Sequence, residues 1–183
     1  MFKYLGCSHA EVLNTLLHQN NIVTVDAACK GVEVGVRSGD TAHYLLLNNP
    51  RLYLYLVDPY LPYHDVGTDI TQEMQNKYKW EADKAVRSFE RNTFIYQTSV
   101  EAAKAMGSFT TIDFVFIDAE HTFDACLADM EAWYPVIRKG GMLCGHDYSM
   151  TPVKKAVTKF AVERNLEVTK TEPSADVWAM EVL

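Results

Sequence analysis

Short apolar runs alternate with stretches of helical periodicity along most of the 183-residue chain. The runs LYLYLV (52–57) and IDFVFI (112–117) are apolar at successive positions, which is typical of strands buried on both faces of a parallel sheet. Further strands are expected at GVEVGV (31–36), TFIYQT (93–98) and MLCGH (142–146). This alternation of strands and helices predicts an α/β fold with a mostly parallel sheet.

The segments around these strands carry the signals that start helices. Ser8 and Glu11 form an S-x-x-E capping box, so a first helix is expected from Ser8. A long helical pattern covers residues 70–90, and Ser99 is placed to cap a short helix over residues 100–106.

A further helical pattern follows the strand at residues 112–117. Its apolar residues recur at helical spacing from Phe123 to Ile137, so we expect a helix that Pro135 kinks or restarts near its end. Gly140 and Gly141 are expected to terminate it.

The last segment contains one more helix and a hairpin. Thr151 followed by Pro152 is typical of an N-cap and the first helical residue. Residues 166–183 are expected as two strands joined by a Pro-Ser turn, which forms a hairpin at one end of the sheet. The chain length suits one domain over residues 1–183, with an N-terminal helical segment (1–29) and a core (30–183).

Composition narrows the class of protein. Apolar residues make up 48% and charged residues 22%, so the chain can build a core and is not disordered. The net charge of −7 argues against nucleic acid as the main partner. No apolar run approaches the length of a membrane span, and the first residues lack a signal-peptide core. Four cysteines without a C-x-x-C spacing indicate reduced thiols, with Cys126 and Cys144 in the core, and a cytoplasmic protein.

Polar residues follow each of the five predicted parallel strands. The carboxyl ends of parallel strands share one edge of a sheet, where ligands bind in α/β folds. We therefore expect a ligand site formed by the residues that follow these strands, namely the turn Gly35–Thr41, Asp58, Thr98 with Ser99, Asp118 with His121, and His146 with Asp147.

Two of these features favour a nucleoside-containing cofactor. Glycines at 35 and 39 leave a bare backbone between a strand and a helix, and Asp58 follows nineteen residues after Gly39, as expected of an acid that binds ribose hydroxyls. A dinucleotide fingerprint would have G-x-G-x-x-G, whereas Arg37 stands at the second glycine position. A nicotinamide dinucleotide is therefore disfavoured.

Four segments carry a resemblance to a known family. They are VEVGVRSGDTAHYLL, LVDPY, FVFIDAEHTFDACLADMEAWYPVIRKGGMLCGHDY and DVWAMEVL, and they resemble the class I S-adenosylmethionine-dependent methyltransferases, most closely methyltransferase family 24. The resemblance covers roughly residues 30–183. It implies a Rossmann-like, doubly wound, seven-stranded mostly parallel sheet with a C-terminal antiparallel hairpin and helices on both faces.

The resemblance also implies a set of cofactor contacts. The glycine turn would hold the methionine part of S-adenosyl-L-methionine, Asp58 the ribose hydroxyls, and Ser99 with its neighbours the adenine. The implied cofactor-binding residues are Glu33, Gly35, Val36, Arg37, Ser38, Gly39, Thr41, Asp58, Pro59, Thr98, Ser99, Val100 and Asp118.

Metal-dependent relatives bind Mg²⁺ at positions that correspond to Asp118, His146 and Asp147. An imidazole at 146 departs from the usual oxygen ligand and suits a transition metal better than Mg²⁺. The sequence thus leaves open a divalent ion (Mg²⁺, Mn²⁺, Fe²⁺ or Zn²⁺), a site without His146, or no metal. His121 resembles the general base of relatives that methylate sugar hydroxyls.

The reaction implied is methyl transfer to the oxygen of a small hydroxylated molecule, sugar-like or phenolic. A metal-coordinated hydroxyl is easier to deprotonate, and His121 would take its proton. The loop PYLPYHDVGTD after Asp58 is a candidate lid or acceptor wall, and it carries Tyr60, Tyr63, His64 and Asp65. The alternatives are a nicotinamide-dependent oxidoreductase and a non-catalytic cofactor-binding relative. A homodimer through the exposed edge strand stays open.

Overall fold

A seven-stranded sheet forms the centre of the computed structural model, which describes residues 8–107, 110–171 and 175–183. The strand order is β5-β2-β1-β6-β7-β9-β8, and the first five strands pair in parallel. Strand β9 is antiparallel to both of its neighbours, so the predicted C-terminal pair is confirmed. The strands are β1 (Cys29–Val34), β2 (Leu52–Val57), β5 (Asn92–Ile95), β6 (Ile112–Ile117), β7 (Ile137–Gly145), β8 (Thr169–Lys170) and β9 (Trp178–Glu181).

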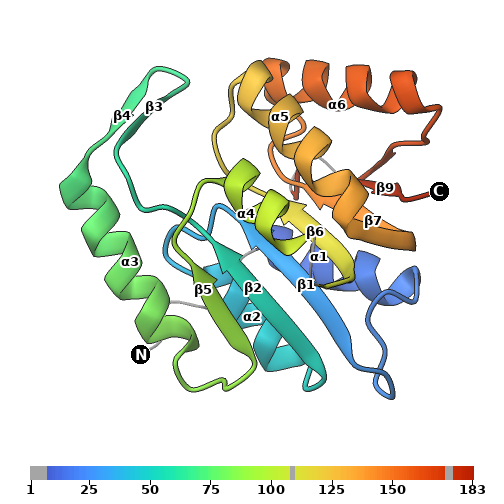
Figure 1. The fold of residues 1–183 in the computed structure, drawn as a ribbon, viewed down its shortest axis with the longest axis horizontal. Helices are drawn as coiled ribbons and strands as arrows, with labels where there is room; N and C mark the ends of the chain where they lie inside the picture. The colour runs from blue at the N-terminus through green and yellow to red at the C-terminus, as the bar shows by residue number, and fades with distance from the viewer. Residues whose placement is uncertain (1–7, 108–109, 172–174) are drawn as a thin grey trace.

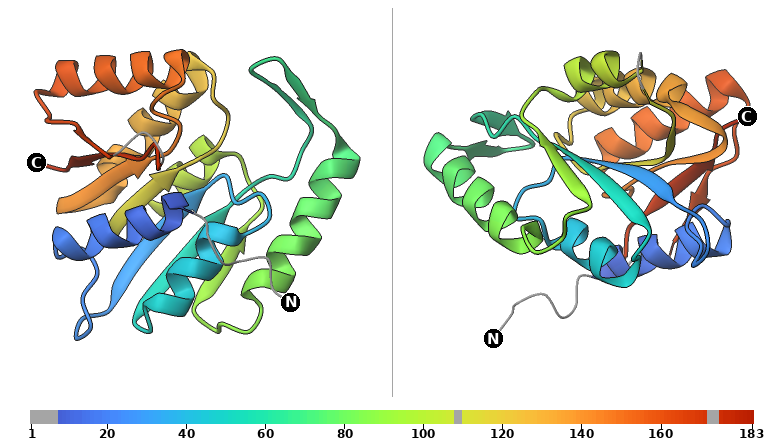
Figure 2. Two further views of the ribbon diagram at one scale, coloured as in Figure 1. Left: turned by 180° about the vertical axis from the view of Figure 1, so that it is seen from behind. Right: turned by 60° about the horizontal axis from the view of Figure 1, so that its bottom comes forward.

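Helices cover both faces of the sheet, as the doubly wound prediction requires (Figures 1 and 2). One face carries α1 (Ser8–Gln19), α2 (Asp40–Asn48) and α3 (Gln72–Val86), and the other carries α4 (Ser99–Met106), α5 (Phe123–Trp133) and α6 (Thr151–Arg164). The predicted Pro-Ser turn between β8 and β9 lies outside the described residues.

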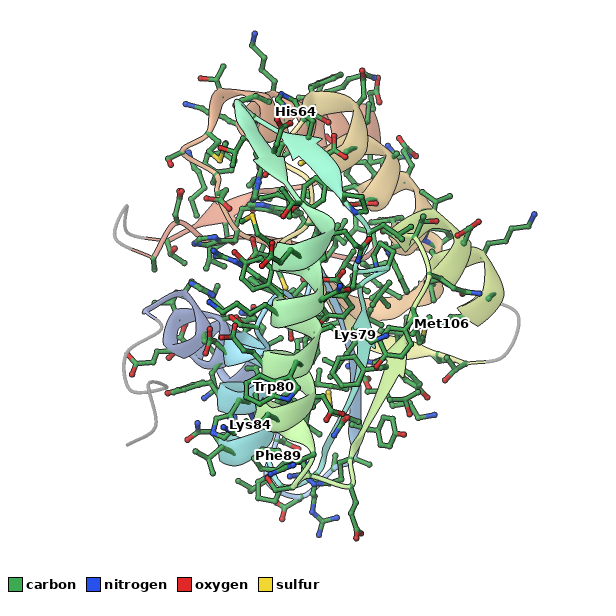
Figure 3. The ribbon with its side chains drawn as sticks, turned by 90° about the vertical axis from the view of Figure 1, so that its left-hand side faces the viewer. His64, Lys79, Trp80, Lys84, Phe89 and Met106 are labelled. Carbon is green, nitrogen blue, oxygen red and sulfur yellow. The ribbon has the colours of Figure 1, made fainter. Side chains whose placement is uncertain are left out.

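The sheet divides the core into two apolar clusters. In β6, Phe114 and Phe116 pack under α1 and α2, while Val115 and Ile117 pack under α4, α5 and α6. Burial on both faces explains why this strand has no polar alternation. Trp133 and Trp178 are buried in the core, whereas Trp80 on α3 is 62% exposed (Figure 3).

The predicted end of the helix after β6 is wrong. Helix α5 ends at Trp133, one 3₁₀ turn containing Pro135 follows, and β7 begins at Ile137. Proline lacks an N–H and clashes with the preceding turn, so the helix stops rather than kinks. Gly140 and Gly141 lie within β7, where Gly140 has φ of 68° and the pairing register with β6 shifts.

Three element boundaries also differ from the sequence-based expectations, namely one strand end and two helix starts. Strand β1 ends at Val34 because the next residue has a positive φ. Thr98, not Ser99, is the N-cap of α4, and Met150, not Thr151, is the N-cap of α6. Since helix ends are the least regular part of a helix, a shift of one residue leaves the packed faces unchanged.

The segment after β2 holds a hairpin that the sequence patterns did not reveal. Strands β3 (Tyr63–Asp65) and β4 (Thr68–Ile70) form a two-stranded antiparallel sheet of their own. Figure 1 shows this hairpin beyond the upper end of α3, and Figure 3 shows His64 on it. Its short strands are mostly exposed, which explains the weak hydrophobic signal.

Cys126 and Cys144 are buried free thiols, as predicted, and Cys29 is also a buried free thiol, while Cys7 lies outside the described residues. Across the described ranges, none of the helices combines the length and apolar character needed to cross a bilayer.

Close packing of β1 on β6 makes Gly31 a sensitive position. A Cβ at Gly31 would lie 2.2 Å from the Phe114 ring, whereas one at Gly107 would have its nearest contact at 3.4 Å. We expect Gly31→Ala to lower the free energy of unfolding by about 1–3 kcal/mol through overpacking. Gly107→Ala, the control, should change it by less than about 0.5 kcal/mol. Urea denaturation measures both, and equal stability of the two variants would contradict this packing.

Candidate active site

The turn after β1 adopts a backbone that favours glycine at two positions. Gly35 has φ of 85° and Gly39, the N-cap of α2, has φ of 78°. A Cβ at Gly35 would lie 2.1 Å from the Asp118 carbonyl oxygen, so this turn packs directly on the end of β6. Arg37 also has a positive φ of 49°, although it is not a glycine. The glycine pattern therefore fixes both the shape of the turn and its approach to Asp118.

The carboxylate of Asp58, at the end of β2, holds this turn in place. Its Oδ2 accepts hydrogen bonds from the backbone N–H groups of Val36 (3.0 Å) and Arg37 (3.1 Å). Its Oδ1 accepts one from the Tyr60 N–H at 2.8 Å. A carboxylate has about four acceptor sites, so capacity for one further donor is left. Burial raises the pKa of Asp58, and the three backbone N–H groups oppose that rise.

The other side chains of the turn make local contacts. The Arg37 guanidinium lies over the Tyr78 ring of α3, 5.1 Å from its centroid. The Ser38 hydroxyl donates to Asp40 at 2.7 Å, and the Thr41 hydroxyl lies 2.9 Å from His9 Nε2. The turn therefore presents mainly backbone groups to a ligand.

Glu33 is a buried acid without a partner. Its side chain is 2% exposed, and Oε2 is one of two buried side-chain polar atoms without a hydrogen bond among the described residues. Burial, together with Asp118, Asp58 and Asp40, raises the pKa of Glu33 well above its usual range. An unsatisfied acceptor in this position costs free energy unless a ligand supplies a donor or a positive charge.

The residues predicted to contact adenine lie at the β5–α4 junction, beside the end of β2. The Asp58 N–H donates to the Ile95 carbonyl at 3.2 Å, which joins the two loops. Thr98 donates to Glu101 at 2.7 Å, and Ser99 accepts from Trp133 Nε1 at 2.9 Å. Val100 is half exposed and carries no polar group. Pro59, also predicted at this site, follows Asp58 directly in the loop.

Three donor atoms converge at the ends of β6 and β7. One atom each from Asp118, His121 and Asp147 lies within 4.8 Å of the other two, which is a spacing that could hold a metal ion. His121 Nε2 lies 2.8 Å from Asp147 Oδ2 and 3.7 Å from Asp118 Oδ1. Asp147 has a positive φ of 57°, a strained conformation for a residue other than glycine. Strain of this kind is concentrated at functional sites.

The β3–β4 hairpin reaches this cluster through Asp65. Asp65 Oδ2 accepts from His121 Nδ1 at 2.6 Å, and Oδ1 accepts from the His121 backbone N–H at 3.0 Å. The predicted lid therefore contacts the reacting edge of the sheet. His64, which was also singled out, instead pairs with Asp69 on the exposed side of the hairpin.

The three carboxylates around His121 favour its charged form. Contacts with Asp118, then with Asp147 and Asp65, raise the pKa of His121 to about 11, although burial opposes this. At neutral pH and without a bound cation, His121 therefore keeps its proton and cannot act as a base. A divalent cation on the neighbouring carboxylates would compete with the imidazolium for their negative charge.

His146 lies beside the cluster rather than among its three convergent donors. Its Nδ1 donates to Asp147 Oδ2 at 3.0 Å and is 3.7 Å from Asp118 Oδ1. Its ring centroid is 4.4 Å from that of His9, which α1 brings to this edge. The sequence predicted His146 as a ligand and did not identify His9.

A separate hollow of about 200 Å³ lies between α1 and the strands β7 to β9. Leu16, Asn20, Gly140 and Glu167 are among its lining residues. It contains none of the predicted site residues, so the convergent polar groups, and not this hollow, define the candidate site.

The arrangement matches a known family. A family model described as a methyltransferase domain, methyltransferase family 24, matches residues 32–148, which span the glycine turn, Asp58, Asp118 and Asp147. The chain belongs to this methyltransferase family. A search of curated proteins found no match.

Solved structures show the same fold in other methyltransferases. A calicheamicin methyltransferase has a TM-score of 0.67 at 16% identity, over 93% of this chain and 77% of its own. An O-methyltransferase from Bacillus cereus, in complex with SAH, has a TM-score of 0.68 at 14% identity, over 97% and 82%. An rRNA methylase from Streptococcus thermophilus has a TM-score of 0.65 at 12% identity, over 94% and 95%. At these identities the likeness shows the fold alone.

The buried carboxyl group of Asp129, which lies near Ser99, should make the stability of the protein depend on pH. Burial raises the pKa of Asp129 to about 6, above the value of about 3.9 for an unfolded chain. The folded state then binds more protons than the unfolded state between these values, so Asp129 lowers stability as pH rises from about 4 to 6. We expect Asp129→Asn to gain stability relative to the parent over this window, by about 1–3 kcal/mol at pH 7. Urea denaturation at pH 4.5 and 7.5 tests this, and a pH-independent difference would contradict it.

Proposed function

We propose that this methyltransferase uses S-adenosyl-L-methionine and transfers its methyl group to a hydroxyl oxygen of a small molecule, sugar-like or phenolic. Membership of the methyltransferase family supports the reaction class. One similar structure is titled a TDP-rhamnose 3′-O-methyltransferase, and another is a complex with SAH, the product of the proposed cofactor. Location in the cytoplasm and a homodimeric assembly stay predictions.

The buried, unpartnered carboxylate of Glu33 carries the proposal. It is the last residue but one of β1, beside the glycine turn, and a positively charged donor would satisfy it and offset the neighbouring acids. The α-ammonium of S-adenosyl-L-methionine is such a donor, and its contact with a buried carboxylate would be a strong, charge-assisted hydrogen bond. Nicotinamide dinucleotides place an anionic pyrophosphate at the corresponding turn, which Glu33 would repel.

The geometry of the same edge supports the remaining cofactor contacts that we propose. Asp58 has acceptor capacity for one more donor, which fits a ribose hydroxyl. The backbone of the turn from Gly35 to Gly39 can approach the ligand closely because two of its residues lack side chains. Thr98, Ser99 and Val100 lie at the N-terminus of α4, shortly after the neighbouring strand β5, where the adenine would be expected.

A divalent ion fits the carboxylates at the ends of β6 and β7. Asp118 and Asp147 would hold it, and when bound it would lower the pKa of an acceptor hydroxyl. His121 is the third polar group at this point, as the general base predicted from the sequence or as a further ligand. Either role places the acceptor oxygen beside Asp118, which contacts the turn proposed to hold the methionine part of the cofactor.

Binding of the cofactor can be tested without knowing the acceptor. We expect calorimetric titration to show binding of S-adenosyl-L-methionine and S-adenosylhomocysteine, and Glu33→Gln to weaken it by about 10–100-fold through loss of a charged hydrogen bond. Glu73→Gln, an exposed acid at the start of α3, is the control and should bind normally. Binding of NADH alone would instead support an oxidoreductase.

Turnover tests the reaction itself. Incubation with methyl-labelled S-adenosylmethionine and a panel of a nucleotide-linked deoxysugar, a glycosylated phenol and a catechol should label at least one acceptor on oxygen. We expect EDTA to lower the rate by about 10²–10⁴-fold, because the acceptor hydroxyl then loses its activation. Cofactor binding without transfer to any acceptor would favour the non-catalytic alternative.

A further inference from the structure

The environment of His121 Nε2 is unusual for an ion pair. This atom is buried and lies within 2.8 Å of Asp147 Oδ2, yet its direction satisfies no hydrogen bond. A ring N–H in a simple ion pair would point at the carboxylate oxygen, since hydrogen bonds weaken steeply as they bend. His121 Nε2 therefore has the carboxylates of Asp147 and Asp118 at 2.8 and 3.7 Å and a well-formed hydrogen bond to neither.

The opposite side of the ring is fixed by two hydrogen bonds. Asp65 accepts from Nδ1 at 2.6 Å and from the backbone N–H of the same histidine at 3.0 Å. The side chains of Asp65 and His121 are only 15% and 22% exposed, so solvent does not compete strongly for these bonds. When a bound cation displaces the second proton of the imidazolium to solvent, the proton that Asp65 holds stays on Nδ1, and Nε2 becomes the nitrogen with a lone pair to offer.

We infer that His121 Nε2 is itself a metal ligand, together with Asp118 and Asp147, and that Asp65 of the β3–β4 hairpin is the residue that positions it. The inference rests on the proposed function. It assigns the divalent ion to these three side chains and makes His121 a metal ligand instead of the general base. One imidazole and two carboxylates favour a first-row transition ion over Mg²⁺, which prefers oxygen ligands alone.

This arrangement assigns a role to the β3–β4 hairpin. Ligand histidines commonly donate their second ring N–H to a carboxylate, which fixes the tautomer and the orientation of the ring. Asp65 makes that contact from an element that is separate from the main sheet and joined to it by loops. The hairpin therefore completes the metal site from outside the strands that supply Asp118 and Asp147.

Titration of the tag-free protein with Zn²⁺, Mn²⁺ and Mg²⁺ tests the inference in the absence of cofactor and acceptor. We expect Zn²⁺ and Mn²⁺ to bind at least about tenfold more tightly than Mg²⁺. His121→Ala should remove this preference, and Asp65→Asn should weaken Zn²⁺ binding by about 10–100-fold. His64→Ala and Asp69→Asn are matched controls, because this exposed pair lies on the same hairpin, and both should bind as the parent does.

A double variant separates positioning from a general disturbance of the hairpin, since Asp65 also accepts a hydrogen bond from the Val66 N–H. If Asp65 acts through His121, then Asp65→Asn should cause no further loss of Zn²⁺ affinity in the His121→Ala background. Additive losses would overturn the positioning role.

Unchanged Zn²⁺ binding in His121→Ala would overturn the site. Zn²⁺ binding that survives the double substitution Asp118→Asn with Asp147→Asn would also overturn it. Failure to bind S-adenosylmethionine would refute the proposed function but leave these metal titrations as they are.

Discussion

Negative charge concentrated at one edge of the sheet is the constraint on which the site depends. Four acids, Glu33, Asp58, Asp118 and Asp147, lie at or just beyond the ends of β1, β2, β6 and β7, and the hairpin adds Asp65. Carboxylates this close raise one another's pKa unless donors or cations compensate them. Backbone N–H groups compensate Asp58, and two histidines compensate Asp118 and Asp147. Glu33 has no such partner, and the proposed cofactor supplies one.

The sheet order makes this concentration unavoidable. Strands β2, β1, β6 and β7 are neighbours and run parallel, so the residues that follow them share one edge. The glycine turn then brings the proposed methionine pocket against Asp118, because Gly35 packs on the backbone of residues 118–119. A ligand bound at the turn and an ion bound at Asp118 would be neighbours for this reason. On the proposed function, the fold would therefore hold cofactor and acceptor side by side.

The sequence predicted the parts of the structure that local patterns encode. Buried parallel strands appear in the sequence as continuous apolar runs. An acid or histidine directly after such a run indicates the edge of the sheet where ligands bind in α/β folds. The positions of Asp58, Asp118 and Asp147 at this edge could therefore be predicted. The hairpin could not be predicted, because its strands are three residues long and mostly exposed. Its contact between Asp65 and His121 joins residues 56 positions apart, which no local pattern contains. Likewise, His9 reaches His146 only through the packing of α1.

The most direct test is a crystal structure of the protein with S-adenosylhomocysteine and Zn²⁺, with the metal located by anomalous scattering. The account predicts the ligand's ammonium within hydrogen-bond distance of Glu33 and the anomalous peak between Asp118, His121 and Asp147. A cofactor bound away from the glycine turn, or a metal peak remote from these three side chains, would contradict it.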